Sequence, residues 1–316
     1  MLNHITKQFS IHIPAKRHGE GKDKKVNFHL VAGSSAFDFA DWIAKNHPDK
    51  AAGVVSPNSK PNNQSWDFGA GFSGVADLCK TGWTCGTHTI CDFSDKIREA
   101  HKKNAKYSRQ TSGLFFDVAD VLAGVPECYF YKNEKKETRE IQLNISITGA
   151  YDVPADTLHN RGAAILALVQ TLQAENWRVK LSLYCALLDY PIGGNDKKPG
   201  YTICRIDLDT RPLDVSELSL ILAHPGFMRR ICLATAETTE QNPNLGGYGG
   251  GTLKMSDYKL RDFSDETKTQ ILQAAIPASE NSLNFLEYVT KSDTQFNTPE
   301  SAAKWVQNQL DTLVRC

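Results

Sequence analysis

The sequence predicts an α/β protein built on a mixed sheet, mostly parallel with one antiparallel edge strand. Three features of the second half lead to this prediction. Residues 140–148 alternate apolar and polar side chains as a strand does, and residues 155–177 then show the apolar spacing of a long helix. Residues 178–190 and 201–209 read as two strands separated by a polar loop with three glycines, which is typical of a hairpin.

These elements determine how the strands pair. A strand–helix–strand unit requires a right-handed crossover and a parallel pair, and a hairpin beside it adds one antiparallel edge strand. A helix over residues 214–224 follows, and Pro225 breaks it. Residues 229–237 fit a strand or a short helix. We expect the C-terminal end to be helical, over residues 264–276, 279–289 and 298–314.

The first half reads as rich in helices. Residues 26–33 alternate as a strand, and Ser34 or Ser35 caps a helix that extends to residue 47. Further helices are predicted from Ser73 to Gly82, over residues 94–109 and over residues 113–124. We therefore expect an α-rich N-terminal region, residues 1–138, packed on an α/β domain of residues 139–316 with a helical C-terminal end.

The element order over about residues 139–275 resembles the von Willebrand factor A-like fold, a Rossmann-like sheet with one antiparallel edge strand. That family holds a metal ion after its first strand with the motif Asp-x-Ser-x-Ser. The matching positions here are Asn144, Ser146 and Thr148, which offer only neutral oxygens. Because hard cations prefer carboxylates, the resemblance implies a degenerate site without a divalent cation.

Three other segments resemble uncharacterised bacteriophage proteins: Trp66 with residues 71–83, residues 158–179 and residues 224–237. This resemblance implies a phage-encoded protein in the cytoplasm of an infected cell, with the virion as an alternative location. No particular catalytic activity follows from this resemblance.

Composition excludes several classes of protein. The 316 residues contain 36 Lys and Arg and 36 Asp and Glu, so the net charge is near zero. This excludes a strongly basic protein that coats nucleic acid and an acidic disordered tail. No apolar run approaches the roughly 18 residues of a membrane span, so we expect no membrane partner. The eight cysteines lie mostly in apolar segments, which indicates buried thiols in a reducing compartment.

Candidate metal and cofactor motifs are incomplete. Cys79, Cys85, His88 and Cys91 are zinc-type ligands, but a strand over residues 84–93 would place His88 opposite the two neighbouring cysteines. The glycine-rich run 246–251 lacks the Gly-Lys-Ser/Thr ending of a phosphate-binding loop. We expect no metal or cofactor, and we interpret Gly247, Tyr248 and Gly249 as a loop that binds a partner.

No catalytic signature occurs. His224 with Arg229 and Arg230 resembles an acid–base group beside a phosphate clamp, but a histidine at a helix C-terminus is the simpler interpretation. We therefore expect a non-catalytic binding or assembly protein with a protein partner. The alternatives are a nucleic-acid-binding accessory factor of a phage transcription or replication complex, and an enzyme with a site assembled from both halves.

The nucleic-acid alternative rests on local positive charge, which steers a polyanion even when net charge is zero. The candidate contacts to single-stranded nucleic acid are Lys24, Lys25, Lys102, Lys103, Lys106 and Arg109. On the predicted helix 94–109, Lys106 shares a face with both Lys102 and Lys103.

Changing Lys102, Lys103 and Lys106 together to Glu is expected to abolish binding of single-stranded DNA at low salt without unfolding the protein. The reason is that phosphate contacts supply such sequence-tolerant binding, which also weakens steeply with salt. Fluorescence anisotropy with a labelled oligonucleotide measures it. A triple variant that binds as well as the parent would show that these lysines form only a solvated surface.

Overall fold

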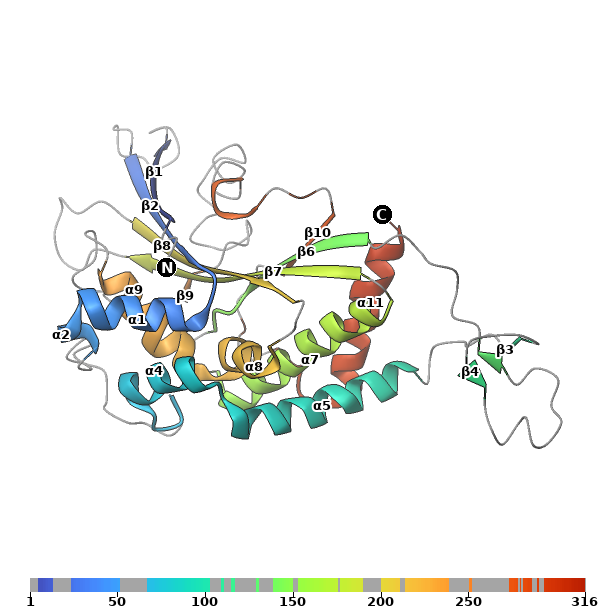
Figure 1. Ribbon diagram of the computed structural model, residues 1–316. Helices are drawn as coiled ribbons and strands as arrows, with labels where there is room; N and C mark the ends of the chain where they lie inside the picture. The colour runs from blue at the N-terminus through green and yellow to red at the C-terminus, as the bar shows by residue number, and fades with distance from the viewer. Residues whose placement is uncertain are drawn as a thin grey trace.

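A mixed sheet of seven strands runs through the structure, and the helices labelled in Figure 1 lie on one side of it. The structure is a computed structural model. It describes residues 5–13, 24–51, 67–102, 109–110, 115–116, 129–130, 139–149, 153–175, 177–189, 200–210, 214–238, 250–251, 273–277, 279, 281–285, 289 and 293–315.

The strand order is β1-β2-β8-β7-β6-β10, and β9 pairs with β7 beside this path. The strands are β1 (Ile5–Ile13), β2 (Lys24–Gly33), β6 (Arg139–Ser146), β7 (Trp177–Asp189), β8 (Gly200–Asp209), β9 (Gly250–Gly251) and β10 (Ser282–Phe285). A separate three-stranded sheet has the order β3-β5-β4 and consists of β3 (Arg109–Gln110), β4 (Phe115–Phe116) and β5 (Tyr129–Phe130).

The helices form a layer around α7, which connects β6 to β7 and packs against α5, α8 and α11. They are α1 (Ala36–Asn46), α2 (Pro48–Ala51), α4 (Gly71–Thr81), α5 (Thr84–Lys102), α7 (Ala155–Ala174), α8 (Val215–Ala223), the π-helix η2 (Phe227–Cys232), α9 (Leu233–Thr238) and α11 (Pro299–Arg315). None of the helices in the described part of the chain is long and apolar enough to cross a membrane.

The apolar side chains of β6 face this helix layer. Ile141, Leu143 and Ile145 are fully buried and belong to one core with the residues of α7. Residues 163–169 of α7 are all buried, because neighbouring elements surround the middle of this helix. Burying a large aliphatic side chain contributes about 1.5–3 kcal/mol, so this contact stabilises the parallel β6–β7 pair.

The predicted strand–helix–hairpin unit is confirmed, but the predicted position of its antiparallel strand is wrong. Strand β8 pairs antiparallel with β7, as expected. On its other side, however, β8 pairs with β2, so it is an interior strand. The reason is visible in β2: consecutive residues His29, Leu30 and Val31 are all buried, so both faces of this strand are covered. The pairing therefore joins residues 24–33 to strands beyond residue 138.

Helix α1 begins after Ser35, whose side chain accepts a hydrogen bond from Asp38 N, and helix α11 occupies the predicted C-terminal segment. Other expectations are wrong. The predicted helix 279–289 contains β10, in which Leu283 is buried between exposed neighbours, the alternation of a strand. Phe115 and Phe116, expected in a helix, form β4. Helix α4 starts at Gly71 rather than after Ser73, while Gly82 ends it as predicted.

A buried ion pair connects the start of α4 to η2. Asp67 is fully buried, and its Oδ2 lies 2.6 Å from Arg230 Nη2. The same carboxylate accepts hydrogen bonds from the backbone N–H groups of Gly69 and Gly71. Buried charges are stable only when they are paired and hydrogen-bonded, so this pair holds the two segments together.

His224 lies beside this pair and is also buried. Its ring centroid lies 4.7 Å from that of Trp83, and its Nδ1 accepts a hydrogen bond from Gly226 N. Burial lowers the pKa of His224 to about 4, and the charge of Asp67 opposes this effect. The imidazole is therefore neutral at pH 7.

Because the pKa of His224 is about 4 in the folded state and about 6.5 when unfolded, the unfolded chain binds more protons between these values. The stability from this residue is complete above about pH 6.5 and falls as the pH drops to 4, by up to about 1.4 kcal/mol per pH unit. Urea unfolding of the parent and of His224→Asn, whose amide oxygen replaces Nδ1, measures this contribution of His224 as a function of pH. If the free energies of unfolding of the two proteins changed in parallel with pH, the lowered pKa of His224 would be contradicted.

Candidate ligand-binding pocket

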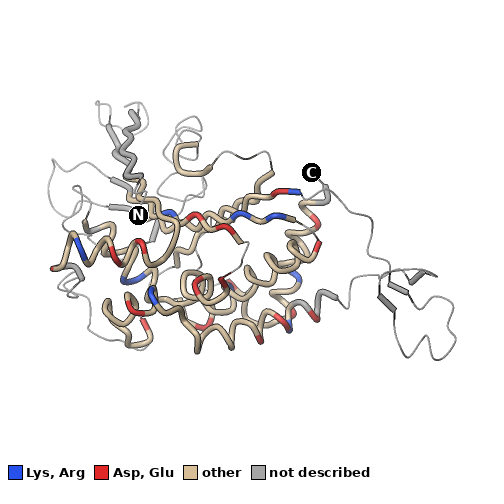
Figure 2. Tube along the Cα trace, in the orientation of Figure 1, with Lys and Arg blue, Asp and Glu red and all other residues tan. Residues whose placement is uncertain are grey.

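The face of the sheet opposite the helices carries polar side chains. In β6, polar positions 140, 142, 144 and 146 alternate with the apolar ones that face α7. Strand pairing aligns them with polar positions of the neighbouring strands, because Gln142 lies beside Lys180 and Ser182 lies beside Asp207. Figure 2 shows that positive and negative residues are interspersed along these strands rather than separated by sign.

A cavity of about 630 Å³ lies on this face. Its floor is formed by side chains of β6, β7 and β8, and its wall contains Pro277, Ser279 and Asn281. The volume falls in the range of about 300–1,000 Å³ that is typical of small-ligand sites. We call this cavity the sheet pocket.

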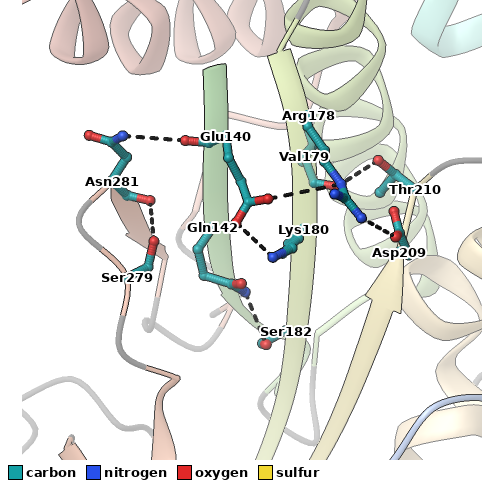
Figure 3. Close-up of polar contacts among 10 residues, drawn as sticks. All are labelled: Glu140, Gln142, Arg178, Val179, Lys180, Ser182, Asp209, Thr210, Ser279 and Asn281. Carbon is teal, nitrogen blue, oxygen red and sulfur yellow. Dashed lines mark hydrogen bonds and ion pairs between the residues drawn. The ribbon is translucent and has the colours of Figure 1, made fainter. Parts of the chain in front are cut away.

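The described residues of the segment 275–281 tie this wall to two different strands. Arg205 Nη1 on β8 donates to Ala275 O at 3.0 Å, and Gln142 N on β6 donates to Asn281 O at 2.9 Å. Asn281 Nδ2 also donates to the Glu140 carbonyl, and Ser279 donates to Asn281 O (Figure 3). The segment therefore passes over the polar face before it enters β10.

The charged groups of the pocket pair with one another. Glu140 lies 2.6 Å from Lys180 and 3.9 Å from Arg178, and Arg178 donates to Asp209 at 3.0 Å. That hydrogen bond is the main reason why the pKa of Arg178 is raised. Arg205 and Asp207 form a further pair at 3.0 Å. Each of the three carboxylates that line the pocket therefore has a cationic partner, and the partner of Asp209 is Arg178, which the lining does not include.

The carboxylate of Asp207 also begins a chain of hydrogen bonds to four neutral residues on four strands, which we call the polar relay (Asp207, Ser182, Gln142, Asn144 and Asn284). Ser182 Oγ donates to Asp207 at 2.6 Å and accepts from Gln142 Nε2 at 3.0 Å. Gln142 Nε2 also donates to Asn144 Oδ1, and Asn144 Nδ2 donates to Asn284 Oδ1 at 2.7 Å. Tyr184, whose pKa is raised by burial, donates to Asn144.

This arrangement suits binding better than nucleophilic catalysis. Ser182 is the only hydroxyl on the floor of the pocket, and its hydrogen bonds to Asp207 and Gln142 occupy it. Among the described residues that line the pocket there is no histidine or cysteine to act as a base or nucleophile. Within the described ranges, no three His, Cys, Asp or Glu side chains are placed to hold a metal ion.

The described part of the chain includes only some of the predicted nucleic-acid residues. Lys24 and Lys25 begin β2, and Lys102 is the last residue of α5. The predicted helix 94–109 is wrong at both ends. Helix α5 already begins at Thr84, and Arg109 belongs to strand β3, where it pairs with Phe130 of β5. Long-range strand pairing here overrides the local helical pattern. Lys103 and Lys106, like Gly247, Tyr248 and Gly249, lie outside the described residues.

The zinc-type residues also differ from expectation. Residues 84–93 belong to helix α5 rather than to a strand, so the predicted separation of His88 from Cys85 and Cys91 by strand alternation does not apply. Cys85 and His88 are exposed, whereas Cys79 is buried on α4, where burial raises the pKa of its thiol to about 12.

Sequence reasoning noted the polar residues Asn144, Ser146 and Thr148 but missed the pocket. Asn144 and Thr148 are fully buried, as hydrogen-bonded parts of the sheet. Polar alternation on three consecutive strands was the available signal. It identifies a polar face, but the partners across strands depend on the register.

Ser182→Ala is expected to lower the free energy of unfolding by about 1–3 kcal/mol, because Gln142 then loses its acceptor inside the protein. Urea denaturation measures the change. Ser279→Ala, at an exposed hydroxyl on the wall of the pocket, is the matched control. Equal stability of the two variants would show that the relay contributes no net stability.

The comparisons with known proteins give a family but no activity. No match was found among curated proteins or among solved structures. The family described as "Domain of unknown function (DUF7192)" matches residues 21–313, which cover both the strands β2 and β8 and the pocket. The chain therefore belongs to the DUF7192 family.

Proposed function

We propose that this protein is a non-catalytic binding or assembly protein and that the sheet pocket is where it holds a partner. The observation that supports this most directly is the internal pairing of the pocket's charges. Glu140, Asp207 and Asp209 each have a cationic neighbour, so the pocket presents oriented polar groups without a free charge of one sign.

A finer fold assignment is part of the proposal. The order β8-β7-β6-β10, with β6, β7 and β10 parallel and β8 antiparallel, supports a von Willebrand factor A-like core extended by β1 and β2. Asn144 stands where that family has its first metal-binding carboxylate, and it donates to Asn284 instead. An origin in a bacteriophage and a location in the infected cell belong to the same proposal.

The two alternatives predict different pockets. A nucleic-acid site requires unpaired positive charge or exposed aromatic rings, whereas the described lining residues include three carboxylates and no aromatic side chain. An enzyme site assembled from both halves requires pocket residues from before position 139, but the lining residues that the structure describes lie between Glu140 and Asn281. Binding of a protein partner is therefore the function that the geometry favours.

Photo-crosslinking tests the proposal. A photoreactive residue in place of Ser279, at the pocket wall, is expected to give a discrete protein adduct in producing cells, while one in place of Asp77 on α4 gives none. Lys180→Glu should reduce the adduct at least tenfold, because it places like charges side by side at Glu140.

Lys80→Glu is the matched control, since it also breaks a surface ion pair, with Asp77, but outside the pocket. It should leave the Ser279 adduct unchanged. Identical adducts from positions 279 and 77, or no effect of Lys180→Glu, would contradict the proposal. An adduct that contains nucleic acid would favour the nucleic-acid alternative.

A further inference from the structure

The polar relay fixes which way its amides point. The carboxylate of Asp207 can only accept, so the single hydroxyl hydrogen of Ser182 points to it. Ser182 must then accept from Gln142, which places the NH₂ group of Gln142 on that side. Its second hydrogen is directed to Asn144 Oδ1.

Gln142 consequently presents its Oε1 as an acceptor. The residue is only 7% exposed and lines the sheet pocket, yet none of the other described residues donates to this oxygen. This oxygen lines the pocket and is accessible from it, so a ligand that supplies an N–H or O–H group here gains a hydrogen bond in exchange for one with water.

A donor lies beside this acceptor. Lys180 is the register partner of Gln142 on β7, and its ammonium group contacts Glu140 among the described residues, while its side chain as a whole is 43% exposed. An ammonium group has three N–H donors, so it has capacity for a ligand acceptor. The pocket therefore offers one acceptor and one donor on adjacent strands.

We infer that the sheet pocket binds the main chain of an extended peptide segment of the protein partner, uncharged at its centre; this rests on the proposed function. One extended residue directs its own N–H and C=O to the same side, as in a hydrogen-bonded strand pair. The N–H matches Gln142 Oε1 and the C=O matches Lys180 Nζ.

Charge and shape favour this class of ligand. Because the carboxylates and cations of the pocket are paired, a strongly charged ligand would have to break an existing ion pair. None of the lining residues within the described ranges is aromatic, which disfavours stacking of a base or a sugar. The cavity of about 630 Å³ fits a short segment rather than a folded surface.

The test uses the full-length protein and a bead library of acetylated, amidated pentapeptides with all twenty residues at each position. Enriched peptides are expected to be uncharged at the centre, with an affinity that changes less than about threefold between 50 and 300 mM NaCl. N-methylation of one central amide should weaken binding about tenfold, and Gln142→Met should cause a similar loss.

A double-mutant cycle tests whether the methylated amide is the one that donates to Gln142 Oε1. The methylated and parent peptides should bind Gln142→Met equally, because both lack the same hydrogen bond. Gln173→Met, which removes an amide bound to Thr210 outside the pocket, is the matched control and should bind as the parent protein does.

Three results would overturn the inference: no enrichment over Gln142→Met, no effect of methylation at any amide, or a steep salt dependence. If these occur while Lys180→Glu still removes the adduct at position 279, the proposed function stands and only the peptide main-chain inference fails.

Discussion

The structure depends on one constraint, the burial of strand β6 on both of its faces. Its apolar positions are covered by α7 and the helix layer, and Asn144 and Ser146 on the opposite face are also almost completely buried. Apolar side chains need only contact, whereas buried amides and hydroxyls need hydrogen-bond partners. The partners of Asn144 come from β6 itself, β7 and β10, so these three strands are held in one register.

The same requirement explains the segment that leads into β10. This edge strand has only four residues, and its approach is fixed by hydrogen bonds to Arg205 on β8 and to Gln142 and Glu140 on β6. The pocket is the space left between that segment and the polar side chains of the sheet. Its position is therefore a consequence of how the polar face is covered.

The ion pairs on the two sides of the sheet differ in how deeply they are buried. On the helix side, the buried ion pair of Asp67 and Arg230 is completed by backbone N–H groups, and a neutral His224 lies beside it. On the pocket side, the ion pairs are partly exposed, so water screens them and each contributes little to stability. The buried pair cannot be broken without leaving a buried charge unpaired.

The sequence by itself determined the elements whose pattern is local and strong. The alternation over residues 140–148, the helix α7, the hairpin of β7 and β8, a cap at Ser34 or Ser35 and helix α11 all follow from period and capping chemistry. Only the tertiary structure decided that β2 pairs with β8, that residues 282–285 form a strand and that Gln142, Lys180 and Asp207 line one pocket. Strand partners far apart in the chain are chosen by burial and register, and neither is encoded in the spacing of neighbouring residues.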